Sequence, residues 1–394
     1  MAGPLTGYRV LDMSRVLAGP WAGQLLADLG ADVIKVERPK VGDDTRHWGP
    51  PYLKDATGAD TEDAAYFFSA NRGKRSLTVD ITQPEGQDII RKLASKVDVL
   101  IENYKVGGLA KYGLDYSSLE KLNPKLVYCS ITGFGQTGPY AQRPGYDFLI
   151  QGMAGLMSVT GEPDSQNGGG PTKVGVAVTD IFTGLYAANA IQGALLERHH
   201  SGMGQYIDLA LLDVQAAVMA NQASNYLIGG QIPGRLGNAH PNIVPYQAFA
   251  TLDSHVIVAV GNDQQFQRFC KAIGEPKWAD DQRYATNTAR VNNRVTLCGQ
   301  ITKHLKQQTS QYWLSKFEDH AVPCGPINTI DQVFDDPQIQ SRNMVLTMQD
   351  PRAGELKLVA NPINYSRSQI EYHLAPPQLG NQTIEILQEY LEYA

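Results

Sequence analysis

The sequence predicts an α/β fold with a large doubly wound domain and a smaller α+β domain. Three observations support this prediction. Short apolar runs alternate with helical segments through the first half of the chain, which is typical of parallel sheets covered by helices. A stretch rich in glycine and proline follows, and then a hairpin pattern appears. With 394 residues, the chain is long enough for more than one hydrophobic core.

The first βαβ unit spans the N-terminal forty residues. Tyr8–Met13 is a short apolar run that indicates a buried strand. Residues 21–29 have apolar side chains at helical spacing, with Pro20 expected as the first helical residue and Gly30 as the stop. Residues 31–37 form the next strand, which should run parallel to the first with a right-handed crossover.

A segment at 38–63 follows, which we expect to be a long surface loop. After it, expected strands and helices continue to alternate to about residue 228. Further strands are expected at 76–80, 97–101, 126–131 and 205–208. Helices are expected at 84–94, in a short segment ending at 119–123, from just after Asp180 to about His199, and at 209–227.

After residue 228 the pattern of alternating strands and helices ends. Gly229–Gly237 reads as a linker, and the two apolar runs within 245–261 predict an antiparallel hairpin. Helices are expected near 264–273, 291–307, 311–320 and 383–393, with a strand at 355–359. We therefore assign residues 1–228, completed by 331–394, to the large domain, and residues 229–330 to the small one.

Composition excludes several function classes. The net charge of −6 argues against a nucleic-acid binder, which would carry a basic stripe. The four cysteines, at 129, 270, 298 and 324, are scattered without metal-binding spacing, so we expect reduced thiols and no metal site. No signal peptide, transit peptide or membrane-spanning run is apparent, and a cytoplasmic protein is expected.

One carboxylate stands at a distinctive place. Asp180 follows the run Pro171–Thr179 and precedes a helix rich in small residues. There it could act as the N-cap of that helix, because Asp is a preferred N-cap. The alternative is that it lies among free backbone N–H groups and acts as a nucleophile.

Nucleotide-binding fingerprints are missing. The first βα turn, Arg15–Pro20, is not GxGxxG, and no phosphate-binding P-loop motif occurs, so NAD is not expected. Polar residues nevertheless follow the expected strand ends, at Arg15, Arg38, Asn103–Tyr104 and Thr132–Phe134. This rim could bind a large anion, and the cations that could meet its phosphates, or be solvated surface charges, are Arg38, Lys40, Arg72, Lys74, Arg75 and Lys111.

Other candidate side chains are ambiguous from the sequence. No Ser/His/Asp set or HExxH motif occurs. His240 lies in a loop rich in glycine and proline, where it could face a ligand or cap a turn. Tyr140 and Tyr146 could each offer a hydroxyl to an active site or pack as rings.

The chain resembles the class III CoA-transferases (the CaiB/BaiF, formyl-CoA transferase-like family) over nearly its whole length. The segments that carry the resemblance include Leu5–Asp12, Arg15–Pro20, Leu29–Pro39, Gly42–Arg46, Asn71–Ser76, Glu102–Tyr104, Gly145–Asp147 and Gly155–Gly161. Within the family it is most similar to the succinyl-CoA:glutarate CoA-transferases, through Tyr128–Gly133, Asn225–Gly229, Ile243–Phe249, Gly261–Phe266 and Cys324–Asn328.

The resemblance implies a set of site residues. Asp180 matches the catalytic aspartate of the family. The residues that match CoA-holding segments are Leu17, Ala18, Arg38, Val79, Asp80, Ile81, Thr82, Asn103, Tyr104, Lys105, Lys111, Thr132, Gly133, Phe134 and Gly135. Lys111 and Thr132 depart from the formyl-CoA type, which has Arg and Lys at these positions.

The resemblance also implies an assembly and a reaction. The family forms a homodimer of two interlocked ring-like chains, each with a large Rossmann-like domain and a smaller one. The expected reaction moves CoA from an acyl-CoA, succinyl-CoA in the nearest relatives, to a dicarboxylic acid such as glutarate, through covalent intermediates at Asp180. We expect Arg235 and His240 to bind the distal carboxylate, backbone near Gly261 to stabilise oxyanions, and Tyr146 to face the substrate.

Three other functions fit the sequence less well. Acyl-CoA racemases share this fold but use a histidine in a Gly-His-Asp triplet, where this chain has Tyr146, a poor base at neutral pH. A nucleotide-dependent oxidoreductase lacks its glycine fingerprint here. A non-catalytic CoA-binding protein would have no need of Asp180.

Overall fold

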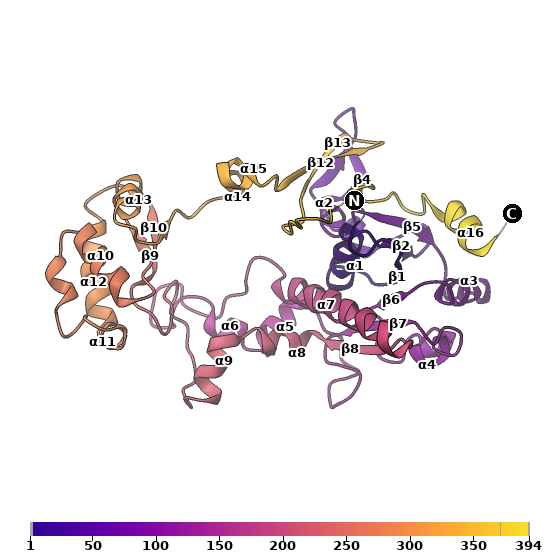
Figure 1. Cartoon of the computed structure of the whole chain (residues 1–394), viewed down its shortest axis with the longest axis horizontal. Coiled ribbons are helices and arrows are strands. Elements are labelled where there is room, and N and C mark those ends of the chain that lie inside the picture. The colour runs from indigo at the N-terminus through magenta and orange to yellow at the C-terminus, as the bar shows by residue number, and fades with distance from the viewer. Residues whose placement is uncertain (1–2, 371, 393–394) are drawn as a thin grey trace. The chain divides into compact units, whose positions relative to one another are not determined.

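A computed structural model describes residues 3–370 and 372–392, which divide into two compact units (Figure 1). The first comprises the chain up to Leu156, Val174–Gly229 and the chain from Pro337. The second comprises Met157–Lys173 and Gly230–Asp336. Each unit has its own hydrophobic core.

A six-stranded parallel sheet forms the centre of the first unit, which confirms the predicted α/β fold. Its strands are β1 (Arg9–Asp12), β2 (Asp32–Glu37), β5 (Lys74–Thr78), β6 (Val99–Glu102), β7 (Val127–Thr132) and β8 (Tyr206–Ala210). They lie in the order β5-β2-β1-β6-β7-β8. In chain order this is the 3-2-1-4-5-6 arrangement of the doubly wound nucleotide-binding fold.

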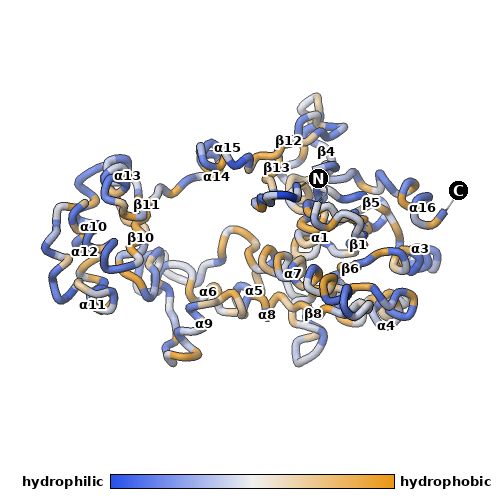
Figure 2. Tube along the Cα trace, in the orientation of Figure 1, coloured by the Kyte–Doolittle hydropathy of each residue, from blue (hydrophilic) through white to orange (hydrophobic). Residues whose placement is uncertain are grey.

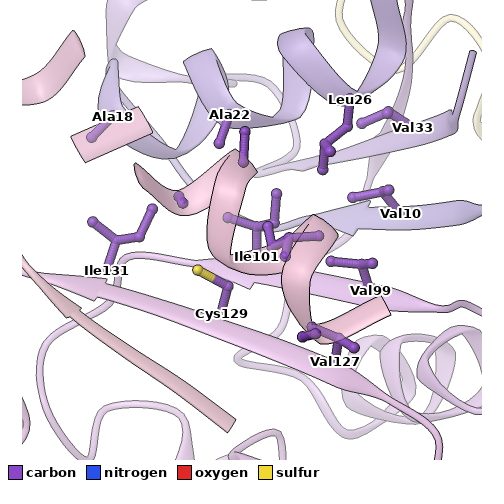
Figure 3. Packing of buried hydrophobic residues seen from close by; sticks show 14 of the residues in the cluster. Val10, Ala18, Ala22, Leu26, Val33, Val99, Ile101, Val127, Cys129 and Ile131 are labelled. Atoms are coloured by element: carbon purple, nitrogen blue, oxygen red, sulfur yellow. The ribbon is translucent and has the colours of Figure 1, made fainter. Parts of the chain in front are cut away.

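Successive strand residues point to opposite sides of the sheet. Both faces are buried, because helices pack on each of them. Val10, Val99 and Val127 pack on one face with α1 (Ala18–Asp28) and α7 (Val178–Ser201), as Figure 3 shows in part. Leu11 and Leu100 pack on the other face, with α3 (Pro84–Ala94), α4 (Tyr116–Leu119) and α16 (Thr383–Leu391). Tyr393, at the end of the expected last helix, lies outside the described residues.

Several elements differ from the sequence predictions. Helix α1 begins at Ala18, so Pro20 is its third residue rather than its first. The expected loop at 38–63 contains a 3-10 turn, η1 (Asp44–His47), and a two-stranded hairpin, β3 (Tyr52–Lys54) with β4 (Asp60–Ala64). The expected helix at 209–227 is divided into α8 (Leu211–Ala217) and α9 (Ala220–Leu227), where Ala220 adopts φ 44°.

The remaining elements of the first unit lie around the sheet. They are α2 (Ala65–Phe68), η2 (Ala110–Tyr112), α5 (Asp147–Met153), α15 (Pro337–Ser341) and the antiparallel pair β12 (Val345–Asp350) and β13 (Gly354–Val359); α6 (Leu156–Val159) spans the boundary with the second unit. Strand β13 matches the expected strand at 355–359, whereas its partner β12 was not expected.

The second unit is built on the predicted hairpin. Strands β9 (Tyr246–Ala250) and β10 (His255–Ala259) pair antiparallel, and β11 (Cys324–Gly325) joins the edge of β10. Its helices are α10 (Asp263–Ala272), η3 (Pro276–Ala279), α11 (Asn287–Asn292), α12 (Arg294–Leu305), α13 (Ser310–Asp319) and α14 (Ile330–Asp335). The expected helix at 291–307 is therefore two helices, broken at Asn293.

Three of the cations proposed to meet phosphates are structural, which corrects that expectation. Lys74 lies 2.8 Å from Asp12, and neither side chain is accessible to solvent. Arg72 pairs with Asp28 at 2.6 Å, and Arg75 pairs with Asp32 and two glutamates of α16. Burial of such charges requires partners, and these partners occupy the cationic groups.

Among the described helices, none has both the length and the apolar character that crossing a membrane would require.

Candidate active site

Two loops meet where the strand order of the sheet reverses, between β1 and β6. The backbone N–H of Arg15 donates to Asn103 Oδ1 at 2.9 Å, and Asn103 Nδ2 donates to the Arg15 carbonyl at 2.7 Å. These two bonds join the loop after β1 to the loop after β6. Open α/β sheets bind ligands at this switch point.

The first of two cavities at this edge contains Asp180, and we call it the Asp180 pocket. Its volume is about 220 Å³. The sequence-predicted residues that line it are Arg15, Leu17, Ala18, Asn103, Tyr104, Lys105, Thr132, Gly133, Tyr146 and Asp180.

The second cavity, which we call the Arg38 pocket, has a volume of about 370 Å³. The sequence-predicted residues that line it are Arg15, Arg38, Val79, Asp80, Ile81, Thr82, Tyr104, Lys105 and Lys111. Arg15, Tyr104 and Lys105 line both cavities, so the two are adjacent.

Apart from the buried Lys35, the cations that line these cavities are exposed to solvent: Arg15, Arg38, Lys105, Lys111 and Arg143. Arg15 lies 3.3 Å from Asp44, with about half of each side chain accessible, and its guanidinium stands 5.5 Å from the ring centroid of Tyr104. Lys111 Nζ lies 4.6 Å from the ring centroid of Tyr112. Exposed pairs of this kind contribute little to folding, so these charges are available to an anionic ligand.

Two of the predicted CoA-binding residues, Phe134 and Gly135, line neither of these cavities. Phe134 is buried, and its ring packs on Tyr140 and below the guanidinium of Arg143. Gly135 adopts φ 86°, and its N–H donates to Thr132 Oγ1 at 2.9 Å. Both therefore shape the strand end that presents Thr132 and Gly133 to the Asp180 pocket.

The residues expected to bind the second carboxylate belong to the second unit. Arg235 forms an ion pair with Asp164, and its Nε donates to the Glu162 carbonyl at 3.1 Å. His240 accepts from the N–H of Asn242 and packs on Tyr246, and burial together with the charge of Arg294 lowers its pKa. The N–H of Gly261, the expected oxyanion donor, is bonded to Gln265 Oε1 at 2.6 Å.

Asp180 lies within helix α7 rather than before it. The helix begins at Val178, so Asp180 is its third residue, and the alternative in which Asp180 is the N-cap is wrong. The N–H groups of Thr179 and Asp180 instead reach Asp147 Oδ1, at 2.9 and 3.3 Å. A carboxylate from α5 thus satisfies donors that a helix start leaves unpaired.

The carboxylate of Asp180 is poorly compensated. Among the described residues, none donates a hydrogen bond to it. Burial raises the pKa of Asp180 to about 7, and the negative charge of Asp147 adds to that shift. A half-buried carboxylate that titrates near neutrality and faces a cavity has the properties of a catalytic group.

A buried ion pair supports the loop beside this pocket. Lys35 Nζ lies 2.8 Å from Asp43 Oδ2, with both side chains inaccessible. Burial favours the neutral form of Asp43, but the charge and hydrogen bond of Lys35, together with two hydrogen bonds from Thr45, outweigh it and lower the pKa of Asp43 to about 2. Asp43 is therefore a carboxylate that can hold nearby backbone N–H groups.

The sequence reasoning missed three residues near Asp180. In the sequence Asp147 stands out only as part of the Gly145–Asp147 triplet, although an Asp far away in the chain can cap a helix. Arg143 lines the Asp180 pocket, with its guanidinium 4.6 Å from the ring centroid of Tyr140. The pKa of Tyr66 is raised to about 12 by burial and by the charges of Asp180, Asp147 and Asp43, which places its hydroxyl in their field.

Within the residues described, no cluster of three or more His, Cys, Asp or Glu side chains is arranged to hold a metal ion.

Comparison with known proteins identifies the family. The model of CoA-transferase family III matches residues 5–383. The succinate–glutarate CoA-transferase of Agrobacterium fabrum is 54% identical over 386 residues, which cover 98% of this chain and 95% of that protein. The human succinyl-CoA:glutarate CoA-transferase is 44% identical over 390 residues, covering 99% of this chain and 86% of that protein.

Solved structures agree with this result. A CAIB/BAIF family protein from Brucella suis superposes with a TM-score of 0.86 at 49% identity, and the match covers 99% of this chain and 100% of that one. With a family model that spans almost the whole sequence and relatives that match it end to end, the chain belongs to CoA-transferase family III and is a CoA-transferase.

Proposed function

We propose that this enzyme transfers CoA from succinyl-CoA to glutarate, with Asp180 as the nucleophile. The named activities of the relatives at 54% and 44% identity support this pair of substrates. The observation that carries the role of Asp180 is its carboxylate, half-buried in a cavity at the switch point with no hydrogen-bond donor among the described residues.

We assign the CoA moiety to the two adjacent cavities. Arg38 and Lys111 in the Arg38 pocket offer cations to the phosphates, with Lys105 at the boundary. The pantetheine arm would then pass Arg15 and Tyr104 and bring the thioester to Asp180. This assignment makes the first unit the CoA-binding unit. It corresponds to the expected large domain of 1–228 with 331–394, except that Met157–Lys173 and residues 331–336 belong to the second unit.

The reaction needs no external energy source, because one thioester replaces another. Asp180 Oδ attacks the succinyl carbonyl carbon, the C–S bond breaks, and CoA leaves as thiolate, which yields a succinyl-aspartyl anhydride. The thiolate attacks the aspartyl carbonyl and releases succinate, leaving an aspartyl-CoA thioester. Glutarate attacks this thioester, and the same steps in reverse release glutaryl-CoA and Asp180 carboxylate.

The tetrahedral intermediates and the second carboxylate need further groups. Backbone near Gly261 is our candidate for the oxyanion donors. Arg235 and His240 are our candidates for the distal carboxylate of the diacid, which requires a cation or several donors. Tyr146, exposed in the Asp180 pocket, is our candidate for a substrate contact.

Replacement of Asp180 tests the function directly. We expect Asp180→Asn to abolish exchange between succinyl-CoA and glutarate and to leave the dissociation constant for CoA nearly unchanged. During turnover of the unaltered enzyme, borohydride or hydroxylamine should trap an adduct at Asp180, identified by peptide mass spectrometry. Normal exchange by the variant, or adducts only elsewhere, would refute the assignment.

An acyl-CoA isomerase of the same fold gives a different result in the same assay. Such an enzyme would exchange the α-hydrogens of the acyl group for deuterium in D₂O without any acid acceptor. We expect no deuterium in recovered succinyl-CoA, and new glutaryl-CoA only when glutarate is present.

We also propose a homodimer of interlocked chains. Helix α7 exposes Phe182, Leu185, Tyr186 and Leu196, and α5 exposes Leu149 and Met153; both helices carry apolar segments in Figure 2. Large apolar patches on a soluble protein mark interaction surfaces. Light scattering should give twice the chain mass, and Leu185→Glu should reduce it; a monomer at micromolar concentration would contradict this proposal.

A further inference from the structure

The first turn of α7 is held by a carboxylate from a different helix. Asp147 begins α5, and its Oδ1 accepts hydrogen bonds from the N–H groups of Thr179 and Asp180. Its Oδ2 accepts from Gln151 Nε2 at 2.7 Å. Gln151 is fully buried, and its Oε1 accepts from the N–H of Val174 at 2.9 Å, on the segment that leads into α7. Both oxygens of Asp147 are therefore fixed.

This arrangement places the carboxylate of Asp147 on the backbone N–H of Asp180 itself. Asp147 accepts a hydrogen bond from the backbone of Asp180, and the negative charge of Asp147 acts on the Asp180 side chain. The remaining titratable and charged groups around Asp180 are Tyr66 on α2 and the pocket residues Arg15, Asp44, Tyr104, Lys105, Arg143 and Tyr146. None of these donates a hydrogen bond to the Asp180 carboxylate among the described residues, so the charge of Asp147 is not offset by a contact cation.

Two adjacent negative charges destabilise the state in which both carboxylates are ionised. Attack by Asp180 on a thioester removes one of these charges, because the negative charge leaves with the CoA thiolate. The repulsion is thus present before the reaction and absent in the anhydride. A more basic carboxylate is also a better nucleophile, and the shift in the pKa of Asp180 has the same sign.

We propose that Asp147 is a positioning residue for Asp180: it fixes the first turn of α7 and keeps a second negative charge beside the nucleophile. This proposal rests on the proposed nucleophilic role of Asp180. In this proposal Asp147 orients the Asp180 carboxylate for attack and also makes that carboxylate more reactive.

Three variants separate charge from position. Asp147→Asn keeps an oxygen that can accept from Thr179 and Asp180 but removes the charge. Asp147→Glu keeps the charge but lengthens the side chain by one methylene. Gln151→Met is the control, because it leaves both carboxylates in place while it removes the hydrogen bonds of Gln151 to Asp147 Oδ2 and to the Val174 N–H.

The readout is the pH profile of kcat/KM for succinyl-CoA with glutarate. The active form of Asp180 is the carboxylate, so activity should rise with pH through a midpoint of about 7. For Asp147→Asn we expect the midpoint to fall by about one pH unit, because removing a neighbouring negative charge favours ionisation of Asp180. For Asp147→Glu we expect an unmoved midpoint and a kcat lowered about ten- to hundred-fold, as misplacement of a reacting group causes. Gln151→Met should keep its midpoint.

The outcomes distinguish this inference from the proposed function. If Asp180→Asn loses exchange but Asp147→Asn keeps its midpoint, the charge role is overturned and the nucleophile stands. A kcat of Asp147→Glu equal to that of the unaltered enzyme overturns the positioning role, and this arm holds even where Asp147→Asn does not fold. If Asp180→Asn retains exchange, the proposed function itself fails, whatever the Asp147 variants do.

Discussion

The backbone N–H of Val16 lies 3.3 Å from each carboxylate oxygen of Asp43, whose charge is set by the buried Lys35. Val16 adopts φ 71°, in the left-handed region that β-branched residues avoid. Val16 lines the Asp180 pocket between Arg15 and Leu17. The hydrogen bonds to Asp43 thus hold a strained residue at the edge of the site.

Replacing Val16 by glycine should leave stability nearly unchanged and weaken CoA binding. Relief of about 1–2 kcal/mol of left-handed strain is offset by the greater backbone entropy of glycine in the unfolded chain. A less ordered loop should raise the KM for succinyl-CoA a few-fold with little change in kcat. Urea denaturation and initial rates measure both quantities. Destabilisation of more than about 2 kcal/mol would indicate that the side chain rather than the strained backbone matters.

Loss of Lys74 should destabilise the fold strongly. Lys74 Nζ donates to Asp12, to the Pro20 carbonyl and to Asn71, in a fully buried position. Lys74→Met would leave Asp12 without this partner, and we expect a loss of about 3–5 kcal/mol in the free energy of unfolding. Adding Asp12→Asn should recover part of it.

The surface pair of Lys54 with Asp60 serves as the matched control. These side chains lie 2.6 Å apart, but more than half of each is exposed. Lys54→Met should change the free energy of unfolding by less than about 1 kcal/mol. Equal losses for Lys54→Met and Lys74→Met would contradict the role assigned to burial.

The sequence predicts the sheet better than it predicts the helix starts. Apolar runs such as Val99–Ile101 identify buried strands, because a strand that is covered on both faces of the sheet has apolar residues at successive positions. The start of α7 depends on Asp147, which lies 33 residues before Asp180 and on another helix. The break between α8 and α9 depends on a left-handed Ala220, which no local propensity indicates.

For the candidate active site too, the sequence predicts what local pattern decides and misses what distant residues decide. Residues that follow strand ends, such as Arg15 and Asn103, could be placed in it because parallel strands end at one edge. Lys74 could not be told apart from a solvated lysine, because its partner Asp12 is brought to it only by the crossover from β1. Tertiary pairing, rather than local pattern, decides which charges are buried.

Glu102 should make stability depend on pH. It is 6% exposed, and burial raises its pKa to about 7 against the hydrogen bonds from Ser130 and from the Tyr104 N–H. Between the ordinary value of 4.5 and about 7, the folded state binds more protons than the unfolded state. Stability from this group is therefore full below about pH 4.5 and is lost as pH rises to about 7.

Glu102→Gln should remove this loss, because the amide stays neutral and can still accept from the Tyr104 N–H. We expect the variant to match the unaltered protein near pH 4.5 and to exceed it by up to about 3 kcal/mol at pH 8, in proportion to the shift. Urea denaturation at a series of pH values provides the comparison. A constant difference across the series would show that Glu102 does not titrate in this window.

Gly184 should be needed for the approach of α7 to α1. A Cβ at Gly184 would lie 2.7 Å from the Ala18 carbonyl and 3.0 Å from Trp21. Gly184→Ala should therefore displace the helix that bears Asp180, and kcat should fall about ten- to hundred-fold. Gly299 on α12 has open space, so Gly299→Ala should keep kcat and gain up to about 1 kcal/mol of stability. An unchanged kcat for Gly184→Ala would mean that the helices can part without disturbing Asp180.

Arg235 should discriminate diacids from monoacids. In this structure its guanidinium is paired with Asp164, whose side chain is 81% exposed, so a substrate carboxylate could take the place of that partner. Arg235→Met should raise the KM for glutarate about ten- to hundred-fold, as loss of a charged hydrogen-bonded contact does, and leave the KM for a monocarboxylate such as valerate unchanged. Asp164→Asn is the control, because it keeps Arg235 and removes its competitor, and its KM for glutarate should stay equal or fall. If Arg235 only stabilised the loop that contains Asp164, both variants would change the KM values for glutarate and valerate alike. The ratio of the KM for glutarate to the KM for valerate would then be the same in each variant as in the unaltered enzyme.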